Sequence, residues 1–154
     1  MSSFNFHAVL EPVLSKPCIL MVAHSIAQLQ ATAGNIQTQF NWPFLSISEH
    51  LSAALISEPF TRRGRLAKNW LQDEIARFAP GRLVLAEIDL LFEPELALDP
   101  LALFRQLSRI TQLLVLWPGT WENNALAYAV PEHAHYRIWR KPEVAIVVDD
   151  RITL

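Results

Sequence analysis

Short apolar runs alternate along the chain with segments whose apolar residues recur at helical spacing. The runs at residues 18–22, 83–86 and 112–117 (QLLVLW) have the length and composition of strands buried on both faces. A shorter run in PFLSIS, residues 43–48, predicts another strand. Such compact apolar runs, separated by amphipathic segments, are typical of a parallel sheet covered by helices.

Amphipathic spacing predicts helices between these strands. The segments concerned lie at 4–14, 25–32, 49–56, 66–78 and 100–109. Asp99 is a typical N-cap, because it directly precedes a proline at the first helical position.

Glycine and proline are expected to divide these elements. Gly34-Asn35 should end the helix that begins near Ser25, and Pro118-Gly119 should end the strand QLLVLW. The segment SEPFTRRGR, residues 57–65, is predicted to be a loop, and ALAYAV, HYRIW and VAIVV are predicted to be short or edge strands. The repeated strand–helix order predicts one α/β domain over 1–154, with a doubly wound parallel sheet flanked by helices in three layers.

Composition narrows the classes of protein that fit this pattern. The chain has 154 residues, of which 51% are hydrophobic and 18% charged, which suits a folded domain and excludes disorder. A net charge of −2 gives no support to general binding of nucleic acid or an anionic membrane. With no signal peptide and no apolar run of membrane length, we expect a cytoplasmic protein.

Metal and cysteine chemistry are sparse in this sequence. Cys18 is the single cysteine, so no disulfide forms within the chain, and its apolar neighbours predict a buried structural thiol. His133 and His135 have a spacing that zinc can use on a strand, but no third ligand is evident. We therefore predict no metal site.

The junction AHSIAQLQ, residues 23–30, lies where an α/β nucleotide-binding protein would carry its phosphate loop. That loop, GxxxxGK[ST], uses glycines to bring backbone N–H groups close to phosphate, a lysine to reach the terminal phosphates and a hydroxyl to hold Mg²⁺. Here Ala23 and Gln28 replace the glycines, Leu29 the lysine and Gln30 the hydroxyl. His24, where phosphate would lie, is predicted to be a polar residue at the helix start. The sequence therefore predicts no nucleotide and no other cofactor.

The strand LVLAEIDLLF lies where a Walker B carboxylate would be expected. Ala86 follows the apolar run directly, Glu87 comes next and Asp89 lies two positions beyond. Without a phosphate-loop lysine, these carboxylates are expected to form hydrogen bonds or ion pairs at the carboxyl edge of the sheet. Because both nucleotide motifs are impaired together, the chain is predicted to have lost ATP hydrolysis and not to be an enzyme.

Two longer stretches carry a family resemblance. They read EIDLLFEPELALDPLALFRQLSR from Glu87 and LLVLWPGTWENNALAYAVPEHAHYR after it, and Trp42-Pro43 also fits. With these motifs the chain resembles the BrxF-like small P-loop proteins of BREX bacteriophage-resistance systems, over about residues 41–137. The resemblance implies a P-loop-NTPase-like (AAA-like) fold and a multi-protein phage-defence locus. The implied companions are a large AAA-type ATPase, a PglZ-type alkaline-phosphatase-like protein and a DNA methyltransferase.

Basic and aromatic residues offer further contacts. Arg62, Arg63, Arg65 and Lys68 form the densest basic patch, which would suit a DNA backbone or, like Arg109, a neighbour's ATP. The simpler interpretation of the patch is a solvated loop and helix start. Trp117 and Trp121 flank Pro118-Gly119, where they would either pack the turn or anchor a protein partner.

Three functional hypotheses follow. The first is a non-catalytic adaptor of a BREX-like phage-defence complex, a pseudo-ATPase that has lost its nucleotide loop. The second is a regulatory ATPase subunit that binds nucleotide through an altered loop, in a homo-oligomer or with a partner's residues. The third is a DNA-contacting module that uses the arginines between residues 62 and 65.

Overall fold

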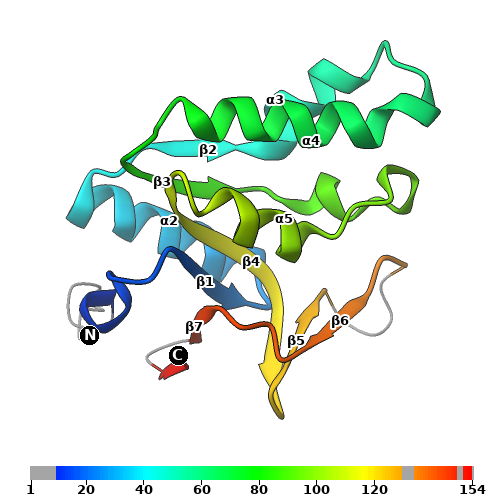
Figure 1. Cartoon of the computed structure of the whole chain (residues 1–154). Helices are drawn as coiled ribbons and strands as arrows, with labels where there is room; N and C mark the ends of the chain where they lie inside the picture. Colours follow the sequence, from blue (N-terminus) through cyan, green and yellow to red (C-terminus); the bar gives the residue numbers. More distant parts are fainter. Residues whose placement is uncertain (1–9, 130–133, 149–150, 154) are drawn as a thin grey trace.

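The chain folds around a mostly parallel sheet. The structure is a computed structural model that describes residues 10–129, 134–148 and 151–153. The parallel strands are ordered β2 (Phe44–Ser46), β3 (Arg82–Ala86), β4 (Gln112–Glu122), β1 (Cys18–Ala23) and β7 (Ala145–Val148), and β8 (Arg151–Thr153) pairs antiparallel with β7 (Figure 1). This arrangement confirms the predicted α/β class and its parallel sheet.

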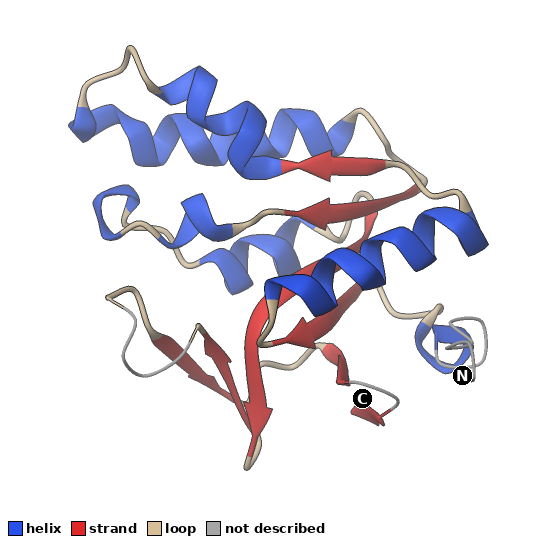
Figure 2. Cartoon of the chain, turned by 180° about the vertical axis from the view of Figure 1, so that it is seen from behind, coloured by secondary structure: helices blue, strands red, loops and turns tan. Residues whose placement is uncertain are grey.

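Helices cover both faces of this sheet. The helix α2 (Ile26–Phe40) and the short 3₁₀ helix η1 (Glu11–Val13) cover one face, and Figure 2 shows α2 crossing in front of the strands. The opposite face is covered by α3 (Ile47–Leu55), α4 (Phe60–Ala76) and α5 (Pro100–Leu107). Successive β1 side chains enter the two cores alternately, since strand side chains point to opposite faces. A strand buried in this way needs the continuous apolar sequence that predicted it.

The helix α2 is longer than predicted, because Gly34-Asn35 does not end it. It continues to Phe40 and ends where Asn41 adopts a left-handed backbone, φ 53°. Ile36 is fully buried, and Leu29, Ala33 and Phe40 pack against the same core. This shared apolar face offsets the roughly 1 kcal/mol that glycine costs inside a helix.

The helix α4 begins earlier than predicted, so part of the segment 57–65 is helical and not a loop. Pro59 occupies the N-cap, and the helix runs from Phe60 to Ala76. Gly64 lies inside it, where a Cβ would be only 2.2 Å from the carbonyl oxygen of Leu96. Gly64 therefore allows close packing of α4 against the 3₁₀ helix η3 (Pro94–Leu96), and it does not mark a turn.

Pro118-Gly119 bends β4 and does not end it, contrary to the prediction. The first half of β4 pairs in parallel with β1 and β3, and the last β1 pair joins Ala23 to Pro118. From Gly119 onward β4 pairs antiparallel with β5 (Ala125–Tyr128), which pairs with β6 (Arg137–Arg140). The strands β4, β5 and β6 thus form a ribbon that leaves the main sheet (Figure 1).

An aromatic cluster attaches this ribbon to the domain. The ring of Phe92, in the 3₁₀ helix η2 (Asp89–Phe92), stacks on Tyr128 with centroids 3.7 Å apart. Trp117 and Trp139 meet Phe92 edge-on at 5.3 and 6.1 Å. The Trp139 indole also donates to Asp99, whose carboxylate caps α5 as predicted by accepting from the Ala102 N–H at 3.2 Å.

Two further sequence predictions concern the helix at the start of the chain and the lack of a membrane-spanning segment. The helix predicted over 4–14 lies mostly outside the described residues, which include only 10–14 of it, with η1 over Glu11–Val13. Among the described residues, no helix combines the length and apolar composition needed to cross a membrane.

Candidate functional site

At the β1–α2 junction a strand leads almost directly into a helix, without the residues of a phosphate loop. The strand β1 ends at Ala23, His24 is exposed and Ser25 caps α2. The Ser25 hydroxyl accepts from the Gln28 N–H at 3.3 Å, and its carbonyl accepts from the Leu29 N–H at 3.1 Å. The N–H of Gln28, one of the first N–H groups of α2 that a phosphate loop would present to its ligand, is therefore already bound by the chain itself.

A small pocket of 210 Å³ lies at this junction. Its walls include His24 from the junction, Gln28 from the first turn of α2, and residues 120–122 from the bent part of β4. Among the described residues that line it, none is a lysine or an arginine, and Glu122 supplies a carboxylate. The volume is below the range of about 300–1,000 Å³ typical of ligand sites, and the carboxylate would repel phosphate.

The other junction residues that were compared with the phosphate-loop motif serve the fold. Ala23 is half-buried and pairs with Pro118 at the end of the parallel ladder. Leu29, in the place of the lysine, packs into the core beneath α2. Gln30, in the place of the Mg²⁺-binding hydroxyl, is exposed on the helix. A helix residue committed to the core cannot extend to a terminal phosphate.

Glu87 follows β3 and binds the neighbouring β2–α3 segment. Its carboxylate accepts from the Ser46 hydroxyl at 2.5 Å, and its carbonyl accepts from both the hydroxyl and the N–H of Ser48. Glu87 has φ 52°, in the left-handed region, and Ala86 before it pairs with Ser46. Glu87 therefore forms hydrogen bonds at the carboxyl edge, as predicted.

Asp89 contacts a different part of the structure. Its carboxylate accepts from the Tyr128 hydroxyl at 2.7 Å, which connects η2 to β5. Burial of Tyr128, and then this hydrogen bond, raise the pKa of its phenol. Neither Glu87 nor Asp89 lines the pocket at the β1–α2 junction. The two carboxylates thus support the fold in separate places and do not converge on one metal ion.

The basic patch lies on α4. Arg62, Arg65 and Lys68 are exposed and follow one another at three-residue spacing, which places them along one side of the helix. Arg63 differs, because its guanidinium donates to the Glu58 carbonyl at 2.9 Å and covers the Phe60 ring at 4.2 Å. Contact of this helix side with DNA or a partner's nucleotide stays a prediction.

Arg109 and the β1–α2 junction lie at opposite edges of the sheet. Arg109 follows α5 and precedes the start of β4, at the amino edge of the sheet, whereas the β1–α2 junction is at the carboxyl edge. Arg109 is exposed and lines a separate hollow with Lys16 and Arg105. It therefore cannot complete the junction within the same chain.

The two tryptophans beside Pro118-Gly119 have different environments. Trp117 is fully buried and its indole donates to the Ala127 carbonyl at 3.0 Å, so it is not available for the partner contact considered from the sequence. The reason is the bend of β4, which folds β5 back over it. Trp121 is half-buried at the junction pocket, and its role as a partner contact stays a prediction.

Cys18 begins β1 and is buried, as predicted. Burial raises the pKa of its thiol to about 12, although the positive charge of Arg105 acts in the opposite direction. At a pH between 9.0 and about 12, the thiol therefore stays protonated in the folded protein, whereas a cysteine in the unfolded chain, with a pKa of 9.0, is largely ionised.

We expect this difference to reduce stability as the pH rises above about 9, by up to about 1.4 kcal/mol per pH unit. Urea unfolding at about pH 8 and pH 10.5 would measure it. The Cys18→Ala variant keeps all the other titrating groups of the natural protein. Its free energy of unfolding should therefore fall less between these two pH values than that of the natural protein. An equal loss in both proteins would contradict the assignment.

Metal ligands are scattered in this fold. Within the described residues no three His, Cys, Asp or Glu side chains gather around a point that could hold a metal ion. His133 lies outside the described residues, and His135 approaches Glu93 at 3.7 Å.

Sequence reasoning missed the residues that arrive from distant segments. Ser46 and Ser48 bind Glu87 only because β2 and β3 pair, and Glu122 reaches the junction only because β4 continues past Gly119. The ENN turn was the available signal for Glu122. Asn123 and Asn124 both adopt positive φ, 52° and 60°, as a two-residue hairpin loop requires.

Comparison with known proteins adds no relative to this description. No protein-family model, no curated protein and no solved structure matches the chain.

Proposed function

We propose that this chain is a non-catalytic adaptor, a P-loop-like pseudo-ATPase that serves in a BREX-like phage-defence complex. The observation that carries the proposal is the small junction pocket, which has Glu122 in its wall and no lysine or arginine among its described lining residues. Productive ATP binding needs cationic groups and free N–H donors at this position. The sequence resemblance over about residues 41–137 supplies the biological setting.

The positions of β1 and β3 support a P-loop-like origin. Their carboxyl ends lie at the same sheet edge, with β4 between them, so a phosphate loop after β1 and a Walker B residue after β3 could have faced one nucleotide. In this chain Ser25 binds the N–H of Gln28, and Ser46 binds Glu87. The Gln28 N–H and the Glu87 carboxylate, which hydrolysis would use, are thus bound by serine side chains that stabilise the fold.

Co-expression with the companion proteins tests this proposal. We expect the chain to co-purify with the large ATPase or the PglZ-like protein, and the Glu87→Gln variant to leave the ATP turnover of that complex unchanged. The Glu87 carboxylate would then contribute only its hydrogen bond to Ser46. The proposal fails if the chain co-purifies with neither companion, or if the chain alone turns over ATP and Glu87→Gln abolishes that activity.

A further inference from the structure

A second and larger hollow lies at the amino edge of the sheet. Its volume is 660 Å³, within the range of about 300–1,000 Å³ found for small-molecule sites. The walls come from the connection before β1, from α5 and from the segment before β7. Cys18 at the start of β1 lines it, whereas Ala23 at the other end of β1 lines the junction pocket. The two cavities are therefore separate.

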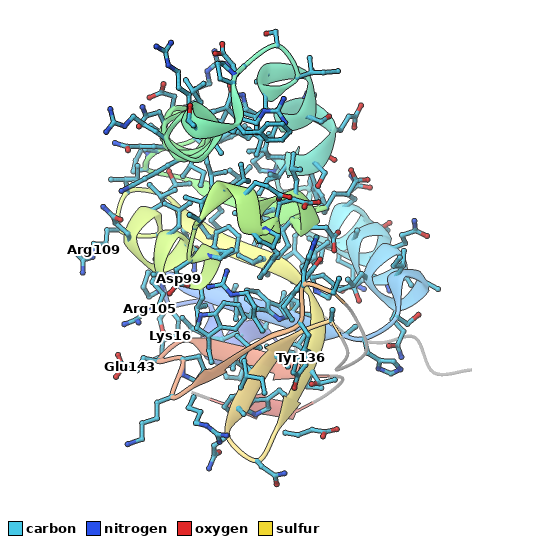
Figure 3. The ribbon with its side chains drawn as sticks, turned by 90° about the vertical axis from the view of Figure 1, so that its right-hand side faces the viewer. Lys16, Asp99, Arg105, Arg109, Tyr136 and Glu143 are labelled. Atoms are coloured by element: carbon cyan, nitrogen blue, oxygen red, sulfur yellow. The ribbon has the colours of Figure 1, made fainter. Side chains whose placement is uncertain are left out.

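The charge in this hollow is opposite to that of the whole chain. Lys16, Arg105 and Arg109 line it, against the single carboxylate of Glu143, while the chain carries a net charge of −2. Figure 3 shows these labelled side chains along one side of the molecule. Three cations and one carboxylate leave an excess of positive charge, which favours an anionic ligand of two negative charges.

Local contacts hold the basic residues in place. The side-chain amide of Gln112 donates to the carbonyls of Leu14 and Lys16, at 2.6 and 2.8 Å, and so fixes the connection that carries Lys16. Arg105 lies in the last turn of α5, where its carbonyl accepts from the Ser108 hydroxyl at 2.8 Å. The backbone on both sides of the hollow is thus positioned before any ligand binds.

The ion pairs of the hollow leave its cations open to a ligand. Arg105 donates to Glu143 at 3.0 Å, but these side chains are 43% and 69% exposed, and such exposed pairs contribute only about 0–1 kcal/mol. Among the described residues, no carboxylate lies within ion-pair distance of Lys16 or Arg109. An incoming anion therefore meets Lys16 and Arg109 without an ion-pair partner among the described residues, and it displaces only a weak partner from Arg105.

The remaining walls are neutral. Pro17, Ala102 and Val144 give the hollow apolar surface, which suits the organic part of a ligand. Cys18 stays a neutral thiol, because burial keeps its pKa high, so it does not repel an anion. Phosphate backbone of DNA fits less well, since it carries one charge per phosphate along an extended line and the site is concave.

We propose that the hollow formed by Lys16, Arg105 and Arg109 binds a phosphate monoester. A monoester carries about −1.5 to −2 charges at neutral pH, which matches the excess positive charge, and arginine forks hold its oxygens in pairs. The monoester can come from a small phosphorylated molecule or from a phosphorylated side chain of a protein partner. This inference does not depend on the adaptor proposal, because the site lies away from the β1–α2 junction.

Calorimetry with phenyl phosphate tests the site, at about pH 8 where the monoester is a dianion. We expect binding that Arg105→Ala and Arg109→Ala each weaken at least about tenfold, as loss of a charge-assisted hydrogen bond implies. Glu143→Gln should tighten binding about threefold, because it removes the opposing carboxylate. Arg77→Ala removes an exposed cation outside the hollow and should change nothing.

Three results would overturn the proposal. They are no binding at about 10 mM phenyl phosphate, binding that the Arg105→Ala/Arg109→Ala double variant retains, and equally tight binding of the dicarboxylate phthalate. A phosphoserine peptide, compared with its unphosphorylated form, distinguishes the two sources. Tighter binding of the phosphopeptide than of phenyl phosphate supports a modified partner, and the reverse order supports a small phosphorylated molecule.

Discussion

Replacing Gly119 with valine should destabilise the protein by about 3 kcal/mol or more, because the site has no room for a side chain. A Cβ on Gly119 would be 1.8 Å from the Ala127 carbonyl oxygen and 3.0 Å from the Trp117 indole nitrogen. These two atoms form a hydrogen bond, so the added carbon would separate β4 from β5 and break that bond as well. Urea unfolding measures the loss.

Gly34→Ala is the matched control for this change. Nothing lies within 4 Å of a Cβ at Gly34, which is exposed within α2. Alanine there should stabilise the protein by about 0.5–1 kcal/mol, since it is the better helix former. If Gly119→Val and Gly34→Ala changed stability alike, the close approach of β4 and β5 at the bend would be wrong.

Phe92→Ala should reduce stability by about 3–5 kcal/mol and release the β5–β6 ribbon from the domain. Phe92 is 1% exposed and lies at the centre of the aromatic cluster, stacked on Tyr128 and bordered by Trp117 and Trp139. Its removal leaves a cavity between η2 and the ribbon. We expect a lower unfolding midpoint in urea and a change in tryptophan fluorescence of the folded protein.

The same substitution at Phe60 provides the comparison. Phe60 is 65% exposed and its ring contacts the Arg63 guanidinium, so Phe60→Ala should alter stability by no more than about 0.5 kcal/mol. Similar losses for both variants would mean that Phe92 does not connect the ribbon to the core.

The central strands were predictable because a strand that is buried on both faces has a continuously apolar sequence. Residues 18–22 and 83–86 are continuously apolar, and β1 and β3 occupy nearly the same positions with both faces buried. Asp99 before Pro100 was equally local, because a cap and the first helical residue are neighbours in the chain. Such signals depend on a few adjacent residues and survive without knowledge of the fold.

The wrong predictions of helix and strand boundaries concern glycine and proline residues whose role depends on distant segments. Gly64 is needed for the backbone of Leu96, and Gly119 for the carbonyl of Ala127, so neither marks the loop or strand end that its identity suggested. Gly34 is tolerated because Ile36 and Phe40 extend the apolar face of α2. Sequence alone cannot separate a glycine that ends an element from one that allows another element to approach.

The candidate sites likewise include features that one continuous segment reveals and features that only the fold brings together. The absence of a phosphate-loop motif from AHSIAQLQ was evident, because such a motif is one continuous segment. The acidic residue in its pocket and the serine that binds Glu87 come from other strands, through pairings that no local pattern specifies. The basic hollow likewise joins Lys16, Arg105 and Glu143, which are brought together only by the sheet and α5.

The claim that the β1–α2 junction holds no nucleotide is tested most directly by calorimetry with Mg-ATP. The Arg105→Ala/Arg109→Ala variant should be used, because it removes the basic hollow as a second place for phosphate. We predict no binding heat at about 1 mM nucleotide. Binding at about 1 μM or tighter in this variant, abolished by Gln28→Glu in the junction pocket, would contradict the account and make AHSIAQLQ an unconventional phosphate loop.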